Sequence, residues 1–410
     1  MKIFKAKDIV SFKTGKLDSN AAIKGGVYPF FTCSQETYAI NSYAFDTECV
    51  LLAGNNAAGV FPLKYFKGKF NAYQRTYIIE PLDESVLDIK YFYYFLRPLL
   101  QTFQQQATGA TTKFLTLKIL NSLEVALPDI TTQKKIAAIL SAYDDLIENN
   151  KQRIKLLENM AEELYKEWFV RFRFPNWQNT EFEKGVPKGW ETSKMSDLVE
   201  FYIGGGWGEE NIDMDFSEEA YVIRGTDIPK INKMDFSDKI LRFHKESNLK
   251  SRMLREYDII FEVSGGSKDQ LLGRNLMMTK NLLNIFNNKV ICASFCKLIR
   301  FNLNKVNPYF IKYYMKLYYD YDLVGIYQVQ STGISNYQFE SFLKHQIVVV
   351  PNESLMMSFE SIVRPLIEEM EVLGQKNSNL EITKNSLLPR LISGKLSVQH
   401  LNIHYPPSMQ

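Results

Sequence analysis

One segment of the chain occurs twice in a fixed register, and this repeat limits the possible folds more than any other feature of the sequence. Pro128 ends a strand-like run, LEVALP, and Pro351, 223 positions later, ends another, QIVVVP. The same offset of 223 then continues without a gap along the next segment. It aligns Ile139 with Ile362, Glu148 with Glu371, Gln152 with Gln375, Leu157 with Leu380, Glu158 with Glu381 and Leu164 with Leu387. A constant register over this length indicates an internal duplication.

Upstream of these segments the two halves match more loosely. Thr108-Gly109 corresponds to Thr332-Gly333 at an offset of 224, whereas DIVSFKTG from Asp8 resembles DLVEFYIG from Asp197 at an offset of 189. The second half therefore holds extra residues between these landmarks. The plan of the chain is a variable globular part followed by a closely repeated segment, twice over.

The first repeated segment has the pattern of a long helix. Residues 131–173 contain neither glycine nor proline, and Thr131-Thr132 are suited to cap the start of a helix. Apolar residues recur at steps of three and four, as in a heptad seam. One column is Ile136, Ile139, Tyr143, Leu146, Leu157, Met160 and Leu164, and the other is Leu140, Ile147, Ile154, Ala161 and Trp168.

The second repeated segment predicts a matching helix from Glu353 to Ile392, with Gly394 as its stop signal. Pro365 removes a backbone hydrogen bond, so we expect a kink there or a later helix start. Polar residues interrupt the seams, and such positions usually fix register at some cost in stability. These residues are Asn150, Asn377 and Lys384. The apolar positions are Phe359, Val363, Leu366, Met370, Leu373, Leu380, Leu387 and Leu391.

Two helices of this length in one chain can pack antiparallel and bury each other's seam. An ordinary helical hairpin is the alternative, but helices in globular proteins are usually three or four turns long, so a spacer that sets a distance is favoured. The predicted fold is α+β, with two mixed α/β domains separated by two long antiparallel helices. The predicted boundaries are 1–130 for the first domain, 131–185 for the first helix and linker, 186–350 for the second domain, 351–396 for the second helix and 397–410 for the tail.

The globular parts alternate short β-branched or aromatic runs with polar loops that contain glycine, which is typical of mixed α/β structure. Two aromatic stretches, residues 89–100 and 308–319, read as helices packed in the core. Some loops combine small residues with side chains that recognise bases and phosphates. The DNA-binding candidates are Asn55, Asn56, Gln74, Arg75, Lys113, Arg224, Thr226, Ser264, Lys268, Arg274 and Ser335. For each of them an ordinary solvated loop remains the alternative.

The residues that several chemistries require are missing. No GxxxxGK[ST] motif is present, and the four histidines and four cysteines lack the spacing of metal ligands. Asn307-Pro308-Tyr309-Phe310 lacks the second proline of the catalytic tetrapeptide of DNA amino-methyltransferases and reads as a helix start. We therefore predict a chain without catalytic residues, bound metal or cofactor. The cysteine usage suggests a reducing, cytoplasmic compartment, and no signal peptide is evident at the N-terminus.

The net charge of +3 neither favours nor excludes a nucleic-acid partner. If the partner is DNA, a local face of the chain or another subunit must supply the positive charge that phosphates require.

Taken together, three segments resemble the specificity subunit of Type I restriction–modification enzymes. The first is PDITTQKKIAAIL with the following ENNKQRIKLLENMAEELYKEWF, the second is the tail SLLPRLISGKL, and the third is LVEFYIGGG after GVPKGWE. The resemblance covers nearly the whole chain in organisation and is specific in the two helical segments. From this resemblance we expect the chain to enter its first recognition domain almost directly, without an N-terminal extension.

The resemblance implies a pseudo-twofold molecule that reads a split site in double-stranded DNA, with the helices setting the gap between the two halves. It also implies two methyltransferase subunits that bind S-adenosylmethionine, and restriction subunits that use ATP and Mg. These cofactors would belong to the partner subunits. The predicted partner-binding residues on the helices are Leu140, Ile147, Ile154, Trp168, Met370, Leu380 and Leu387.

Three other functions remain open from the sequence. A methyltransferase or nuclease with its own site would modify DNA as a purified chain. A coiled-coil scaffold would bind only proteins. A standalone or decoy specificity subunit would serve a methylation-only system, and the sequence does not separate it from the main hypothesis.

Overall fold

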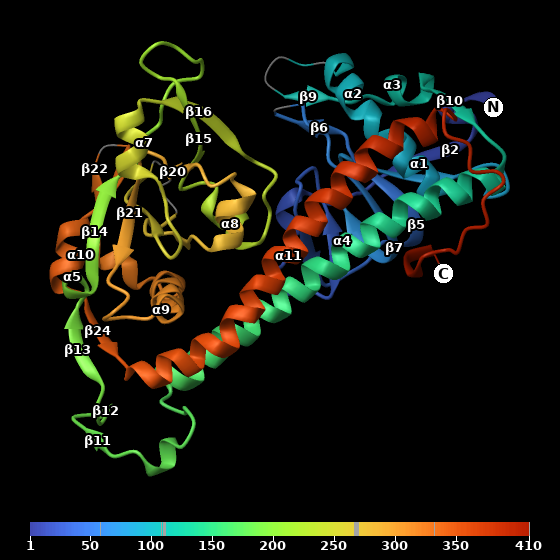
Figure 1. Ribbon diagram of the computed structural model, residues 1–410. Helices are drawn as coiled ribbons and strands as arrows, with labels where there is room; N and C mark the ends of the chain where they lie inside the picture. Colours follow the sequence, from blue (N-terminus) through green and yellow to red (C-terminus); the bar gives the residue numbers. More distant parts are fainter. Residues whose placement is uncertain (58, 108, 110–111, 266–269, 332, 410) are drawn as a thin grey trace. The chain divides into compact units, whose positions relative to one another are not determined.

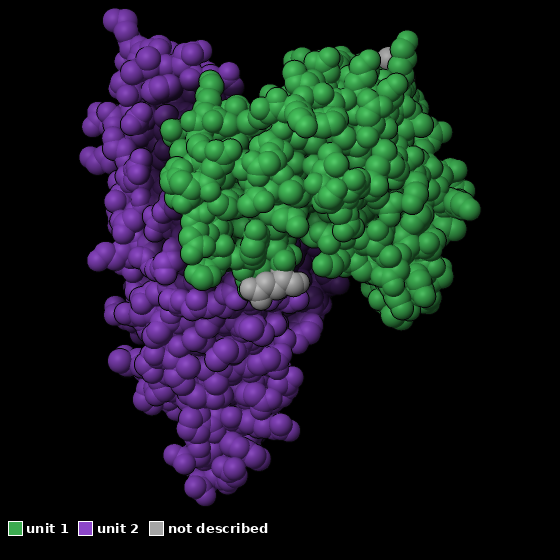
Figure 2. Space-filling view, turned by 90° about the vertical axis from the view of Figure 1, so that its right-hand side faces the viewer, with its two compact units in different colours: residues 1–147, 380–410 green, residues 148–379 purple. Residues whose placement is uncertain are grey.

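The chain forms two compact units, coloured separately in Figure 2. The computed structural model describes residues 1–57, 59–107, 109, 112–265, 270–331 and 333–409. Unit 1 comprises residues 1–147 and 380–410, and unit 2 comprises residues 148–379. Each unit therefore contains one globular part and a portion of both long helices. In the described part of the chain, no helix combines the length and the hydropathy that crossing a membrane requires.

The globular part of unit 1 is built around a six-stranded sheet in the order β2-β8-β5-β7-β3-β4. Its central strand β5 carries the run CVLLA, which is buried on both faces of the sheet. The strands of this unit are β1 Lys2–Lys5, β2 Val10–Thr14, β3 Tyr28–Phe31, β4 Thr37–Ile40, β5 Phe45–Ala53, β6 Asn55–Asn56, β7 Leu63–Ala72, β8 Thr76–Pro81, β9 Lys113–Phe114 and β10 Glu124–Leu127. The short helices are α1 Ile89–Leu96, α2 Leu100–Gln106 and α3 Leu117–Ser122.

The globular part of unit 2 contains a four-stranded sheet in the order β14-β21-β17-β19 and a three-stranded sheet in the order β16-β15-β20. Its strands are β11 Phe182–Glu183, β12 Val186–Pro187, β13 Glu191–Lys194, β14 Val199–Gly204, β15 Glu218–Ile223, β16 Ile240–His244, β17 Ile259–Glu262, β18 Ser264–Gly265, β19 Asn275–Met277, β20 Val290–Cys292, β21 Cys296–Phe301, β22 Gln328–Ser331, β23 Ile334–Tyr337 and β24 Ile347–Val350. Its helices are α5 Met195–Leu198, α6 Ile228–Asn232, α7 Glu246–Arg252, α8 Lys280–Ile285, α9 Pro308–Asp320 and α10 Phe339–His345.

The two globular parts share a topology that their sequences hardly show. In unit 1 the first strand β1 pairs antiparallel with the last strand β10, and in unit 2 β13 pairs antiparallel with β24. The order β2-β8-β5-β7 in unit 1 corresponds to β14-β21-β17-β19 in unit 2. The aromatic stretches form α1 and α9, whose tyrosines and phenylalanines are largely buried, as predicted. The predicted mixed α/β fold with an internal repeat is confirmed.

The first long helix, α4, runs from Ile130 to Tyr165 and continues as a π-helical turn over Lys166–Val170 (Figure 1). Its 36 residues span about 54 Å at about 1.5 Å per residue. The predicted cap at Thr131-Thr132 is wrong, because Asp129 caps this end. The Asp129 carboxylate accepts bonds from the Thr132 amide at 2.9 Å and the Thr132 hydroxyl at 2.7 Å.

The second long helix, α11, covers Glu353–Ile392 without a break, as the apolar spacing predicts (Figure 1). The expectation of a later start because of Pro365 is wrong. Pro365 lies on the exposed face of the helix, where the carbonyl that loses its hydrogen bond can bind water. Gly394 follows the helix with a φ of 72°, and its amide donates to the carbonyl of Leu391. The predicted stop signal at Gly394 is confirmed.

The two long helices pack antiparallel within each unit. In unit 1 the buried Lys384 of α11 donates to Asp144 of α4 at 2.7 Å. In unit 2 Asn150 donates to Asn377 at 2.8 Å, and Trp168 packs on Phe359 near the other end of this paired stretch.

Only the second of the two predicted apolar columns of α4 lies fully in the seam. All of its members, from Leu140 to Trp168, are buried. In the first column Leu146 and Met160 are 54% and 58% exposed. The seam between the helices is therefore narrower than the sequence suggests.

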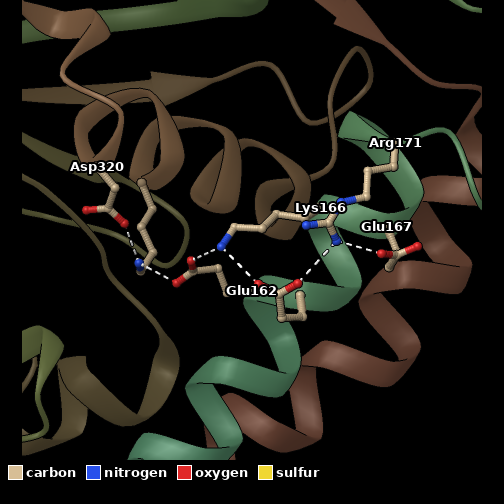
Figure 3. A network of polar contacts seen from close by, with 7 residues as sticks. Glu162, Lys166, Glu167, Arg171 and Asp320 are labelled. Atoms are coloured by element: carbon tan, nitrogen blue, oxygen red, sulfur yellow. Dashed lines mark hydrogen bonds and ion pairs between the residues drawn. The ribbon is translucent and has the colours of Figure 1, made fainter.

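A chain of ion pairs ties α9 to the C-terminal end of α4 in unit 2 (Figure 3). Lys316 of α9 contacts Asp320 at 2.5 Å and Glu162 of α4 at 2.8 Å. Glu162 also accepts from Lys166 at 2.5 Å. The chain continues along α4 through Glu163, Arg171 and Glu167.

Candidate nucleic-acid interface

The first candidate site lies in unit 1, where β6 pairs antiparallel with β9. This pairing sets Asn55 opposite Phe114 and Asn56 opposite Lys113. It therefore joins three of the predicted DNA-binding residues into one short two-stranded element, although Lys113 follows Asn56 by 57 positions in the sequence. All four side chains are half-buried.

The turn between β7 and β8 joins the same element and brings Arg75 to it. The amide of Gly54 donates to the carbonyl of Arg75 at 2.8 Å, and a Cβ atom on Gly54 would lie 2.6 Å from that oxygen. The glycine therefore permits this close approach. The guanidinium of Arg75 lies over the Phe114 ring, 5.2 Å from its centroid.

Arg75 is exposed and is free of ion pairs with carboxylates within the described residues. Its donors are thus available for a phosphate or for the acceptor edge of a guanine, both of which arginine contacts in a bidentate manner. The neighbouring Gln74 is also exposed, but its side chain donates to Asp18 at 2.8 Å.

The second candidate site lies in unit 2 and has a similar two-stranded element. There β18 pairs antiparallel with β23, which sets Ser264 opposite Asn336 and Gly265 opposite Ser335. The Ser264 hydroxyl contacts the Asn336 side chain at 3.1 Å. Ser335 is only 4% exposed, so its side chain is not on the surface. Lys268 lies outside the described residues.

Four predicted residues of unit 2 line one cavity of about 570 Å³, namely Arg224, Thr226, Ser264 and Arg274. The two arginines are engaged within the chain. Arg274 donates from Nε to Glu262 at 2.7 Å, and this hydrogen bond raises the arginine's pKa. Arg224 donates to Asp227 through Nε and Nη2. Thr226 is exposed at the cavity.

Two aromatic side chains also lie at this cavity: Trp207 ends a loop, residues 204–207, that the sequence also marks as a DNA-binding candidate, whereas Phe295 is not predicted from the sequence. Trp207 is 39% exposed and packs on the guanidinium of Arg242 at 4.8 Å, and Phe295 is 60% exposed. Phe295 lies in the turn between the buried strands β20 and β21. The sequence signal that could have identified Phe295 is a large aromatic residue in a short turn between two apolar runs. Exposed aromatic rings are suited to stacking on bases.

The other residues that could carry chemistry, Cys292, Cys296 and Asn307, are buried in the core or cap a helix. Cys292 and Cys296 are buried, and burial raises the pKa of the Cys292 thiol to about 12. Asn307 caps α9 by accepting from the amide of Tyr309 at 2.9 Å, which confirms the predicted helix start. Among the described residues, no three His, Cys, Asp or Glu side chains are grouped so as to hold a metal ion.

Comparison with known families gives the decisive observation. Residues 1–159 match the family model described as the Type I restriction modification DNA specificity domain. The chain therefore resembles Type I specificity subunits over its first 159 residues. The resemblance predicted from the sequence is therefore confirmed.

Type I specificity subunits also match over longer stretches. The chain is 37% identical to the EcoDI specificity subunit of Escherichia coli over 174 residues, which cover 39% of this chain and 38% of that subunit. It is 27% identical to the MjaIX specificity subunit of Methanocaldococcus jannaschii over 332 residues, or 79% of this chain and 72% of that subunit. The match to the EcoDI subunit thus spans well under half of its length.

The fold agrees with a solved Type I S subunit from M. genitalium. The two structures superpose with a TM-score of 0.59 at 15% identity, covering 95% of each chain. The agreement extends beyond residues 1–159, so the architecture of the second half also follows that of a specificity subunit.

The structure places most of the predicted partner-binding residues in the core of the chain itself. Leu140, Ile147, Ile154, Trp168 and Met370 are at most 8% exposed, whereas Leu380 and Leu387 are half-buried. The first five side chains fill the seam between the helices and are not accessible to a partner. The apolar side chains that the long helices expose are different ones. They are Leu146, Leu156, Met160, Met357, Ile362, Val372 and Ile382.

Proposed function

We propose that this chain is the DNA-reading, non-catalytic subunit of a Type I restriction–modification complex, and that it recognises a two-part asymmetric site. One observation carries the proposal. Each half of the repeat has a short two-stranded element next to conformationally permissive glycines, built from residues of types that contact bases and phosphates. Two such readers with different sequences would recognise two different half-sites.

In unit 1 the proposed reader is the β6–β9 element together with Arg75. Arg75 would contact a base edge or a phosphate, and Asn55, Asn56 and Lys113 would contact neighbouring groups. In unit 2 the proposed reader is the rim of the cavity, where Thr226, Ser264, Trp207 and Phe295 are grouped. The buried pair of Arg274 with Glu262 would support this rim from below.

The long helices would set the unread gap between the half-sites and would present their exposed apolar side chains to two methyltransferase subunits. Those subunits would bind S-adenosylmethionine and methylate adenine. Restriction subunits that use ATP and Mg would complete the complex. None of these cofactors is proposed to bind this chain.

The test is single-molecule sequencing of DNA from cells that express the chain with its neighbouring methyltransferase subunit, compared with cells that lack the chain. The expected result is adenine methylation in a two-part motif only when the chain is present. An active methyltransferase complex that leaves no such motif would contradict the proposal and favour a decoy or scaffold.

Two altered chains sharpen this test. Exchange of residues 186–350 for the equivalent domain of a relative should change only one half of the motif. Insertion of one heptad at paired positions of α4 and α11 should lengthen the gap by about 10 Å, or about three base pairs. A motif that is unchanged by the exchange would contradict the reading role of residues 186–350, and a gap that is unchanged by the insertion would exclude the spacer role of the helices.

A further inference from the structure

A second cavity in unit 2 lies where the globular part packs on the long helices, and it shares Gln270 and Arg274 with the wall of the cavity in the proposed DNA reader. Its volume is about 390 Å³, within the range of small-molecule sites. Much of the wall is apolar and comes from Ile228, Ile231, Met234, Leu276, Leu282 and Ile367. Glu371 of α11 also lines the cavity.

Glu371 is a buried carboxyl group with an unused oxygen. Glu371 is 2% exposed. Oε1 accepts from the hydroxyl of Thr279 at 2.6 Å, whereas Oε2 makes no hydrogen bond of normal geometry among the described residues; the side-chain amide of Asn281 is near enough to lower the pKa of the carboxyl. A buried charged group without full hydrogen bonding is costly, and such an atom marks a position where a ligand donor would be stabilising.

None of the described cationic side chains around the cavity forms an ion pair with Glu371, although the charge of Lys312 lowers the pKa of its carboxyl and so partly offsets the effect of burial. Arg274 is paired with Glu262, and Lys316 is paired with Glu162 and Asp320. Lys312 of α9 lies over the ring of Tyr313 at 4.2 Å and forms no ion pair within the described part of the chain.

The remaining polar groups that line the cavity are occupied or exposed. Glu158 of α4 accepts from the Tyr313 hydroxyl at 3.2 Å, and the Tyr319 hydroxyl of α9 donates to the carbonyl of Leu271 at 3.3 Å. Lys233, after α6, is exposed. Glu368 lies one turn from Glu371 on α11 and is also exposed. The free acceptor deep in the cavity is therefore Oε2 of Glu371.

We propose that this cavity is a binding site for a small organic cation, with an apolar body in the cavity and an ammonium or amidinium group on Oε2 of Glu371. A positively charged donor forms a stronger hydrogen bond with a carboxylate than a neutral one does, and it also compensates the buried charge. An aromatic or aliphatic body would contact the apolar wall. This site does not depend on DNA reading.

The sequence repeat supports a special role for this place in the second half. Glu371 aligns with Glu148, which is exposed, and Gly374 aligns with Lys151. A Cβ atom on Gly374 would lie 2.6 Å from the Cβ and carbonyl oxygen of Met234. The glycine thus lets the loop after α6 close the cavity against α11, and Glu148 supplies a matched control residue.

The experiment uses the full chain, with benzylamine as the probe and benzyl alcohol as its neutral counterpart, and measures dissociation constants by ligand-observed NMR. Benzylamine should bind saturably and at least tenfold more tightly than benzyl alcohol. Glu371→Gln should abolish this preference, whereas Glu148→Gln should leave it unchanged. Circular dichroism spectra that match the spectrum of the unaltered chain would show that both variants are folded.

A pH series on the unaltered chain provides a test that needs no variant. Burial raises the pKa of Glu371 to about 7, so its ionised fraction falls about tenfold from pH 8 to pH 6. Benzylamine stays protonated over this range and should bind about tenfold more weakly at pH 6. Absence of saturable binding, equal binding of the alcohol, or a preference that survives in Glu371→Gln would each overturn the proposal.

Discussion

The side-chain amide of Asn150 donates to the side-chain oxygen of Asn377 at 2.8 Å, so that a polar pair joins α4 to α11 in unit 2. Both side chains are partly buried. An amide pair of this kind is satisfied only when the two helices are in the correct register, whereas apolar contacts tolerate sliding. The pair therefore specifies how the helices align.

Replacement of both asparagines with leucine should raise stability and loosen register. Because the polar pair contributes less than apolar packing would, the urea midpoint should rise by an amount equivalent to about 1 kcal/mol. Disulfide trapping between cysteines at paired helix positions should then capture more than one alignment. The exposed Asn149→Leu is the control. A double variant that keeps a single alignment would show that Asn150 and Asn377 are not needed for register.

Lys384 offers a contrasting prediction because its charge is buried. Its side chain is 2% exposed and lies 2.7 Å from both Asp144 and Glu381. Lys384→Ala removes the cation that compensates these partly exposed carboxylates and should lower the unfolding free energy of unit 1 by about 2–3 kcal/mol. Lys384→Met, which keeps the side-chain volume, should lower the unfolding free energy by a smaller amount. Equal losses in the two variants would assign the effect to charge alone.

Glu371 should make stability depend on pH. Its pKa is raised from 4.5 to about 7 in the folded chain, chiefly by burial, so the folded state binds more protons than the unfolded state between these pH values. The unfolding free energy should therefore fall as the pH rises from about 4.5 to 7, by up to about 3 kcal/mol. Glu371→Gln should remove this dependence in urea unfolding measured across the range. Glu148→Gln should retain it, and a flat profile in the unaltered chain would refute the assignment.

Arg75 should control one half of the recognised site. Arg75→Ala removes a bidentate donor and should weaken DNA binding by about 1–3 kcal/mol, with relaxed sequence preference in one half-site only. Arg75→Lys keeps the charge but not the planar fork, so it should lose specificity more than affinity. Methylation motifs and salt-dependent binding of the complex measure both effects. A uniform loss of affinity with an unchanged motif would identify Arg75 as a phosphate contact.

Gly374 should resist substitution although it lies inside a helix. Alanine normally stabilises a helix by about 1 kcal/mol relative to glycine, but here its Cβ atom would lie 2.6 Å from Met234. Gly374→Ala should therefore destabilise unit 2 by about 1–3 kcal/mol in urea unfolding. Pro365→Ala on the exposed face of the same helix is the control and should stabilise it. Stabilisation by both changes would mean that the loop after α6 moves away easily.

The long helices could be predicted from the sequence because periodicity and stop signals are local properties. The bounds of α11 and the role of Gly394 follow from them. The cap at Asp129 was missed because aspartate and threonine are both common N-caps, and the geometry of the turn decides between them. The exposure of Leu146 and Met160 could not be read from spacing, because both columns fit a heptad.

The candidate site was only partly predictable. Residue type and loop context selected Asn55, Lys113 and Arg75, but only the pairing of β6 with β9 shows that they lie together. The same criteria selected Arg274 and did not reveal that Glu262 occupies its guanidinium. Ion pairs between distant strands leave no local trace in a sequence. Glu371 illustrates this limit. It is buried, whereas Glu148, which aligns with it in the sequence repeat, is exposed.

The pairing of β1 with β10, and of β13 with β24, has a consequence for how such a chain can vary. Each pair brings the two ends of a globular part to one edge, so everything between them forms a closed loop, here called an insertion, which precedes α4 in the first half and lies between α4 and α11 in the second. The first insertion spans residues 2–127 and the second spans residues 191–350. Because the entropy of loop closure grows with the logarithm of length, the longer insertion costs only about 0.2 kcal/mol more to close. A globular part can therefore change in length with almost no change in the entropic cost of bringing its two ends together.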